Sequence, residues 1–81
     1  MTVMPTILRV RGYRLFFYSD EGSEPPHIHV TVGDGIAKFW LTSLELANSK
    51  RLRAHELTAA RNLVNDHRDF LMEAWNAYFG A

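Results

Sequence analysis

The sequence predicts an α+β domain, with an antiparallel sheet of about four strands covered on one face by a long C-terminal helix or two shorter helices. Three observations lead to this prediction. Apolar and polar residues alternate through most of residues 6–41, which is the period of a β-strand. Apolar residues then recur every three or four positions from about residue 54 to residue 79, as in an amphipathic helix. The 81 residues are enough for only one domain.

The composition fits a small packed domain. Hydrophobic residues make up 47% of the chain, and nine basic residues balance nine acidic ones, so the net charge does not favour non-specific attraction to nucleic acids or membranes. The absence of cysteine excludes disulfides and cysteine metal sites and suits the cytoplasm. We therefore expect one cytoplasmic domain over residues 1–81, with residues 1–3 as a loose extension before Met4-Pro5, and no signal peptide or membrane span.

Four strands are expected, over about residues 6–11, 13–18, 27–32 and 36–41. Gly12 permits the first turn, Gly33-Asp34-Gly35 predicts a hairpin, and the breaker-rich residues 19–26 predict a loop. One pairing register gives a single apolar face, which a slip of one residue would invert. That face carries Leu8, Val10, Leu15, Phe17, Ile28, Val30, Val32, Phe39 and Leu41.

Residues 42–52 fit two structures. Thr42 is followed three positions later by Glu45, which is the spacing of a helix capping box. A bent strand carrying Leu44 and Leu46 is the alternative, and we expect the helix.

The helical pattern from Ala54 to Phe79 contains no proline or glycine, and Gly80 follows as a stop signal. A continuous helix of this length would reach about 39 Å, which is longer than a small sheet is wide. We therefore expect a break near Asn65-Asp66.

The run Pro25-Pro26-His27-Ile28-His29 is the main candidate for chemistry. Both imidazoles project from one face of a strand, with Cα atoms about 6.5–7 Å apart. Such a pair can chelate a divalent metal, act as acid and base near neutral pH, or lie on a solvated surface. The third ligands available to a metal are Glu24, Asp34, His55 and His67. None of them lies at a diagnostic spacing, so we expect no metal and no cofactor.

The same face of the sheet is expected to carry cationic and aromatic side chains. They are Arg9, Arg11, Arg14, Phe16, Tyr18, Lys38 and Trp40. Cations stabilise a phosphorane-like transition state and rings stack on bases, so His27, His29 and Lys38 are candidate catalytic residues of a metal-independent ribonuclease. A wet surface or a protein interface is the alternative, since arginine, tyrosine and tryptophan are typical of interfaces. Its candidate binding residues are Arg9, Arg11, Arg14, Tyr18 and Trp40.

Five stretches, which cover almost the whole chain from Met4, carry a family resemblance. They are Met4-Pro5-Thr6-Ile7-Leu8-Arg9, Gly12-Tyr13-Arg14-Leu15-Phe16-Phe17-Tyr18-Ser19, Glu24-Pro25-Pro26-His27-Ile28-His29-Val30, Ala37-Lys38-Phe39-Trp40-Leu41 and Trp75-Asn76-Ala77-Tyr78-Phe79. Together they resemble the small bacterial family DUF4160. The resemblance implies one component of a toxin–antitoxin-like two-gene cassette, often beside a short DUF2442-like protein. It carries over no accepted catalytic residue.

Two functions are therefore expected as alternatives. In the first, the chain is a cassette component that binds a partner protein or nucleic acid through the face carrying His27 and His29. In the second, it is a ribonuclease toxin that uses the two histidines as acid and base. The neutral charge favours the first, because proteins acting on RNA usually carry a basic face. A DUF2442-like protein, RNA, DNA and a second copy of the chain are the candidate partners, and no membrane is expected.

Overall fold

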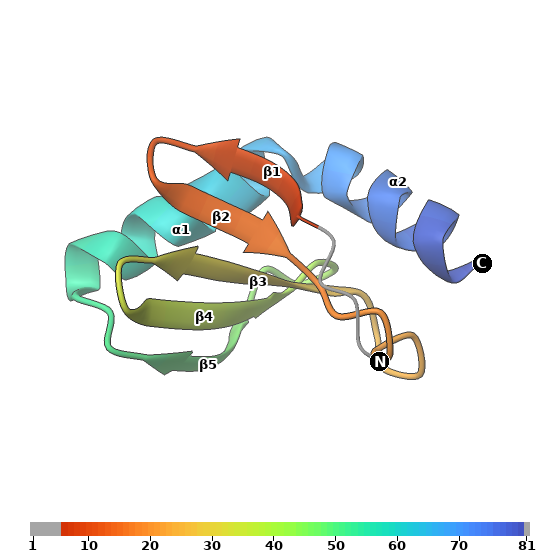
Figure 1. Ribbon diagram of the computed structural model, residues 1–81, viewed down its shortest axis with the longest axis horizontal. Helices are drawn as coiled ribbons and strands as arrows, with labels where there is room; N and C mark the ends of the chain where they lie inside the picture. Colours follow the sequence, from red (N-terminus) through yellow and green to blue (C-terminus); the bar gives the residue numbers. More distant parts are fainter. Residues whose placement is uncertain (1–5, 81) are drawn as a thin grey trace.

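The computed structural model describes residues 6–80, which form a five-stranded antiparallel sheet followed by two helices (Figure 1). The elements are β1 (Thr6–Val10), β2 (Tyr13–Phe16), β3 (His27–Val32), β4 (Gly35–Trp40), β5 (Leu46–Lys50), α1 (Ala54–Asp66) and α2 (Arg68–Phe79). Each strand pairs with its neighbours in the sequence, in the order β1-β2-β3-β4-β5. The α+β fold is as predicted, with one strand more. The predicted extension at residues 1–3 and the Met4-Pro5 start lie outside the described residues.

The fifth strand corrects the prediction of a helix over residues 42–52. Leu44 has a positive φ of 63°, which an α-helix does not allow, and its N–H donates to the carbonyl of Trp40. The N–H of Trp40 donates to the carbonyl of Glu45, which closes a turn at the end of β4. These hydrogen bonds make the segment a hairpin, and β5 then pairs with β4.

The pairing register places the apolar residues in rows across the sheet. Val30 lies opposite Leu15 on one side and Ala37 on the other, and Ile28 lies opposite Phe39. This inner face is the one predicted from the alternation. The turn between β3 and β4 is also as predicted, with Gly33 at a φ of 55°, the left-handed region that favours glycine.

Both helices pack on the inner face of the sheet. Ala60 and Val64 of α1 and Leu71 and Trp75 of α2 are buried in the same core as the sheet residues. The helices meet at His67, next to the predicted break, and α2 ends at Gly80, whose φ of 66° makes it the predicted stop. Among residues 6–80, neither helix has the length and apolarity needed to cross a bilayer.

The loop between β2 and β3 lies at the end of the sheet that α2 passes (Figure 1). Gly22 of this loop packs so closely against the Phe79 ring that a Cβ at this position would lie 2.5 Å from the ring. The Arg68 guanidinium donates to the carbonyl of Thr42, which ties the start of α2 to the turn after β4. This end of the molecule is therefore closed by α2, the loop and the sheet together.

A substitution at Gly35 tests how closely the start of β4 packs against the chain that follows β5. A Cβ at Gly35 would collide with the side chain of Leu52 and the carbonyl oxygen of Arg51. We expect Gly35→Ala to lower the free energy of unfolding by about 1–3 kcal/mol, because the chain after β5 must move away. Urea denaturation measures this change, with Asp34→Ala in the same exposed turn as the control. Equal stability of Gly35→Ala and the wild type would contradict this packing.

Candidate functional site

His27 and His29 alternate at the start of β3, on the outer face of the sheet. His29 lies opposite Lys38 on this face, whereas the ring of His27 lies at the end of the sheet, where Trp75 of α2 reaches it. Both residues are buried, with 0% of His27 and 9% of His29 exposed. The ring of His27 lies between the indoles of Trp40 and Trp75, with centroid distances of 5.7 Å and 4.8 Å. His29 stacks on Phe16 at 5.3 Å. The pair is thus held in an aromatic pocket rather than displayed on a solvated surface.

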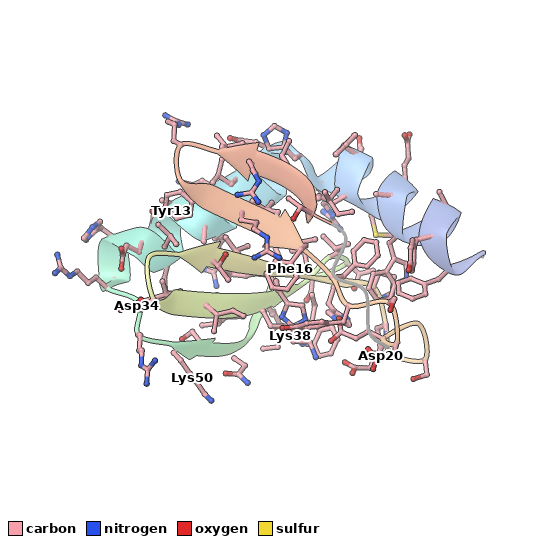
Figure 2. The ribbon with its side chains drawn as sticks, in the orientation of Figure 1. Tyr13, Phe16, Asp20, Asp34, Lys38 and Lys50 are labelled. Atoms are coloured by element: carbon pink, nitrogen blue, oxygen red, sulfur yellow. The ribbon has the colours of Figure 1, made fainter. Side chains whose placement is uncertain are left out.

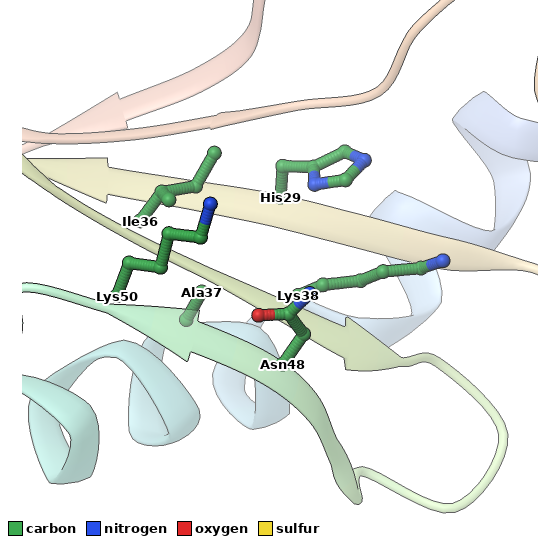
Figure 3. Close-up of a pocket in the computed structure, with 6 residues that line it drawn as sticks. All are labelled: His29, Ile36, Ala37, Lys38, Asn48 and Lys50. Atoms are coloured by element: carbon green, nitrogen blue, oxygen red, sulfur yellow. The ribbon is translucent and has the colours of Figure 1, made fainter.

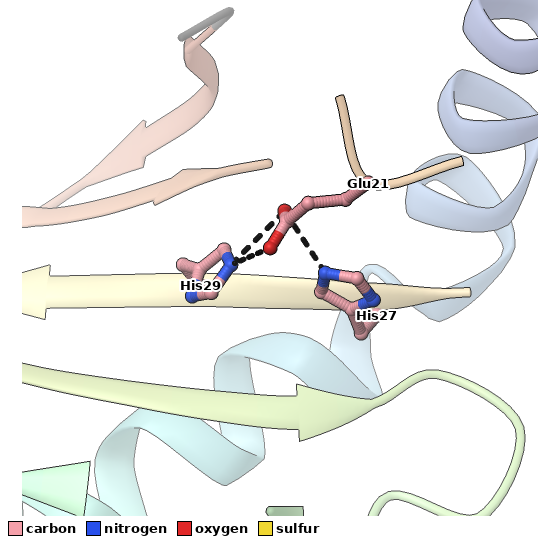
Figure 4. Close-up of side chains that lie close together, drawn as sticks. All are labelled: Glu21, His27 and His29. Carbon is pink, nitrogen blue, oxygen red and sulfur yellow. Dashed lines mark hydrogen bonds and ion pairs between the residues drawn. The ribbon is translucent and has the colours of Figure 1, made fainter. Parts of the chain in front are cut away.

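Glu21 reaches over both imidazoles from the loop between β2 and β3 (Figure 4). Its Oε1 lies 2.9 Å from Nε2 of His27, and its Oε2 lies 3.0 Å from Nε2 of His29. The N–H of Tyr18 donates to Oε1 at 2.9 Å, which fixes the carboxylate to the start of its own loop. One carboxylate therefore connects the loop to two positions on β3.

A hydrogen bond shows which ring nitrogen of a neutral His27 carries the proton. Nδ1 lies 2.9 Å from the carbonyl oxygen of Pro25, which only accepts, so Nδ1 carries hydrogen. In the neutral ring Nε2 then has no hydrogen and carries a lone pair. Nε2 is fully buried, and its 2.9 Å contact with Glu21 is not aligned as a hydrogen bond, so it has no hydrogen-bond partner within residues 6–80.

The surroundings shift the pKa values of Glu21 and His29. Burial raises the pKa of the Glu21 carboxyl, but hydrogen bonds from the Tyr18 amide and His29, together with the close contact of His27, outweigh it, so the pKa lies below its ordinary value. Burial lowers the pKa of His29, and the neighbouring Glu21 carboxylate only partly opposes this effect. At neutral pH we therefore expect an ionised Glu21 beside a neutral His29.

Lys38 lies opposite His29 in the β3–β4 pairing, so the structure brings together the three predicted catalytic candidates. Its ammonium group donates to Oε1 of Glu24 at 2.7 Å and lies 4.7 Å from the Trp40 ring centre. The hydrogen bond with Lys38 lowers the pKa of the Glu24 carboxyl. The charge of Lys38 is thus already paired.

The predicted binding residues divide into two groups. Arg9, Arg14 and Trp40 lie on the outer face, as predicted, and Tyr18 packs against His29 at 5.0 Å. Arg11 does not belong to this face. It lies in the turn after β1 with a φ of 48° and lines a hollow beside α1, because the strand ends one residue earlier than predicted.

A hollow of about 160 Å³ opens on the outer face over β4 and β5. Figure 3 shows the residues that line it, which are His29, Ile36, Ala37, Lys38, Asn48 and Lys50. Lys50 and Asn48 come from the strand that the sequence did not predict. One wall of this hollow therefore comes from a strand that the sequence pattern did not predict.

Glu21 is the main residue that the sequence analysis missed. Glu24 lies closer to the histidines in the sequence, but it pairs more closely with Lys38, at 2.7 Å, than with Nδ1 of His27, at 3.9 Å. Asp34 lies in the turn at the opposite end of the sheet from this loop (Figure 2), and His55 lies on α1. The only signal for Glu21 was an acidic residue in the loop that precedes the histidine strand, and this signal fits Asp20 and Glu24 equally well.

The lowered pKa of His29 predicts how stability changes with pH in chelator-treated protein. Below the ordinary histidine value of 6.5 the unfolded chain takes up a proton at this position, whereas the folded chain resists it. The contribution of His29 is thus present above pH 6.5 and is lost as the pH falls. We expect a lower urea midpoint at pH 5.5 than at pH 7.5, with a smaller difference in His29→Gln. A wild-type midpoint that stays level or rises on acidification would contradict this assignment.

Comparison with known proteins identifies a family. No curated protein and no solved structure matches this chain. A sequence model of the family described as "Domain of unknown function (DUF4160)" matches residues 12–76, well over half of the chain. The matched range contains Glu21, His27, His29 and the strands that carry the hollow. The chain therefore belongs to the DUF4160 family.

Proposed function

We propose that this chain is a binding module that docks an acidic partner protein on the outer face of its sheet. The observation that carries the proposal is an excess of unpaired positive charge on that face. Arg9, Arg14 and Lys50 have no carboxylate within ion-pairing distance among residues 6–80. The acidic groups nearby, Glu21 and Glu24, are already engaged by the histidines and Lys38.

The pairing register aligns these basic residues across the whole sheet. Arg9 lies opposite Arg14, Arg14 opposite Thr31, and Thr31 opposite Ile36. Ile36 then lies opposite Lys50 on β5. This row, from Arg9 through Arg14, Thr31 and Ile36 to Lys50, is called the basic row below. A partner lying across the strands would meet positive charge at both ends and an apolar centre.

The hollow beside the basic row offers a place for a side chain. It lies between Lys50 and Lys38, with Ile36 contributing apolar surface (Figure 3). An acidic side chain entering the hollow would gain a charge-assisted hydrogen bond from the Lys50 ammonium group. The hollow therefore favours a partner that presents aspartate or glutamate.

The edge of the sheet adds a second point of attachment. All five residues of β5 are exposed, and within residues 6–80 the strand pairs only with β4. Its outer backbone groups are free to pair with a strand from another chain, which is a common mode of peptide recognition.

The aromatic residues of this face support a protein partner rather than RNA. Binding to single-stranded RNA uses exposed ring faces on which bases stack. Here Phe16 is buried beneath the Arg14 guanidinium, and the Lys38 ammonium lies over the Trp40 ring. Two of the rings that a base would need are therefore covered.

The ribonuclease alternative has less support. A general acid or base must come within hydrogen-bonding reach of the group it protonates or deprotonates. His27 is fully buried, and both histidines lie against Glu21. A substrate would have to displace the loop to reach His27.

The family resemblance suggests the partner to test first. A DUF2442-like protein from the neighbouring gene of a toxin–antitoxin-like cassette is our proposed partner, with a second copy of this chain and nucleic acid as the competing occupants. We also propose that the protein acts in the cytoplasm, in line with its lack of cysteine.

Charge reversal on the basic row tests the proposal. We expect Arg14→Glu and Lys50→Glu each to weaken binding to the neighbouring-gene protein at least about tenfold, because each places like charge against an acidic surface. Isothermal titration calorimetry measures the affinity, and binding of the wild type should weaken as the salt concentration rises.

Arg11→Glu is the matched control, because it makes the same charge change on the β1–β2 hairpin but away from the outer face. Its affinity should equal that of the wild type. The proposal fails if the wild type does not bind, if all three variants bind equally, or if the same charge reversals abolish binding of single-stranded RNA instead.

A further inference from the structure

We propose that Glu21, His27 and His29 form a binding site for a divalent transition metal, with zinc as the ion used to test it. This site is independent of partner docking on the basic row. The carboxylate of Glu21 and the two Nε2 atoms all lie within 4.8 Å of one another. Donors around a tetrahedral zinc lie about 3.3–3.5 Å apart. The Glu21 oxygens lie 2.9 and 3.0 Å from the two Nε2 atoms and would move slightly outward, whereas the two Nε2 atoms would move toward each other.

The unpartnered nitrogen of His27 is the observation that points to a cation. Nδ1 donates to the Pro25 carbonyl, so in the neutral ring Nε2 holds an unpartnered lone pair 2.9 Å from an oxygen of the Glu21 carboxylate. Two electron-rich atoms this close repel each other when no proton or cation lies between them. A cation between them turns the repulsion into two favourable bonds.

Buried histidine ligands of metals commonly have this arrangement. A metal-binding imidazole usually donates its other N–H to a carbonyl or carboxylate, which fixes the ring and its tautomer. The Pro25 carbonyl does this for His27. An imidazolium at this position is the alternative, and it would form a buried ion pair with the Glu21 carboxylate 2.9 Å away, which the zinc titration below tests against a metal site.

The groups around the site hold the three ligands in place. The histidines alternate on one strand, so the backbone of β3 sets their spacing. The two tryptophans fix the His27 ring, and Phe16 stacks on that of His29. The Tyr18 N–H orients the Glu21 carboxylate, and the contact between Gly22 and Phe79 presses its loop onto the helix.

The ligand set indicates the kind of metal. Two imidazoles and one carboxylate suit zinc and the other first-row divalent ions, whereas calcium and magnesium prefer oxygen donors alone. Three protein ligands leave at least one position of a tetrahedral ion for water or another small ligand.

Lys38 lies opposite His29 in the β3–β4 pairing, and its positive charge opposes a second one at the proposed site. Its ammonium group is paired with Glu24 at 2.7 Å, which weakens this opposition. The negative charge of Glu21 would partly neutralise the bound ion, and the lowered pKa of this carboxyl keeps it ionised at neutral pH. The local charges therefore permit a divalent ion.

Zinc binding to the untagged, chelator-treated protein tests the site. We expect one zinc ion per chain with a dissociation constant of about 1 μM or lower by competition with a chromophoric chelator. Zinc at a hundredfold excess over that constant should raise the Tm by at least about 5 °C, because it binds only the folded chain. Glu21→Gln and His29→Gln should bind zinc at least about tenfold more weakly.

His55→Gln is the matched control, because His55 is exposed on α1 and away from the site. It should bind zinc like the wild type. Nuclear magnetic resonance of the wild type adds a readout that does not depend on a variant folding. The Nε2 resonances of His27 and His29 should shift on zinc binding, while those of His55 and His67 stay in place. No stoichiometric binding, unchanged affinity in Glu21→Gln and His29→Gln, or shifts at His55 or His67 instead would overturn the proposal.

Discussion

The functional end of this domain depends on one carboxylate that lies between two histidines. Glu21 contacts Nε2 of both His27 and His29 while its own loop donates a hydrogen bond to it from Tyr18. The carboxylate thus joins the loop to β3, together with the hydrogen bond between the Pro25 carbonyl and His27. The bridge also creates the feature that most needs an explanation, the buried lone pair of His27 facing an anion.

This bridge divides the outer face of the sheet into two regions with different chemistry. At the start of β3 the loop, Trp40 and Trp75 enclose the histidines, so ligands there must be small. Across the basic row the same face is open, charged and bordered by the exposed strand β5. The two proposals therefore concern adjoining surfaces that meet at His29, an enclosed site suited to an ion and an open one suited to a protein.

Most of the fold could be predicted because side-chain alternation and helical periodicity report burial directly. Leu15, Val30 and Ala37 are in the core because their strands bury one face. The fifth strand could not be predicted in the same way, since all of its residues are exposed and its position depends on hydrogen bonds around Leu44. Here the hydrogen bonds of the turn after β4 outweigh the helix-capping pattern of Thr42 and Glu45.

The site was only half predictable for a related reason. Two histidines on alternate residues of a strand must share a face, so their proximity followed from geometry. The position of Glu21 depends on how an irregular loop folds back over the sheet, and no periodicity describes that. The burial of His27 also depends on Trp75, which lies 48 positions later in the chain on α2. Contacts of this range arise only from the assembled fold.

The central claim is that Glu21 couples the loop to the histidine strand, and a double-mutant cycle in chelator-treated protein measures this coupling most directly. The unfolding free energies of the wild type, Glu21→Gln, His29→Gln and the double variant are compared at pH 7.5. Our account predicts that the two substitutions are not additive, with a coupling energy of about 0.5–3 kcal/mol, as for residues in direct contact. Additive effects would mean that the carboxylate and the imidazole do not interact, and would contradict the account.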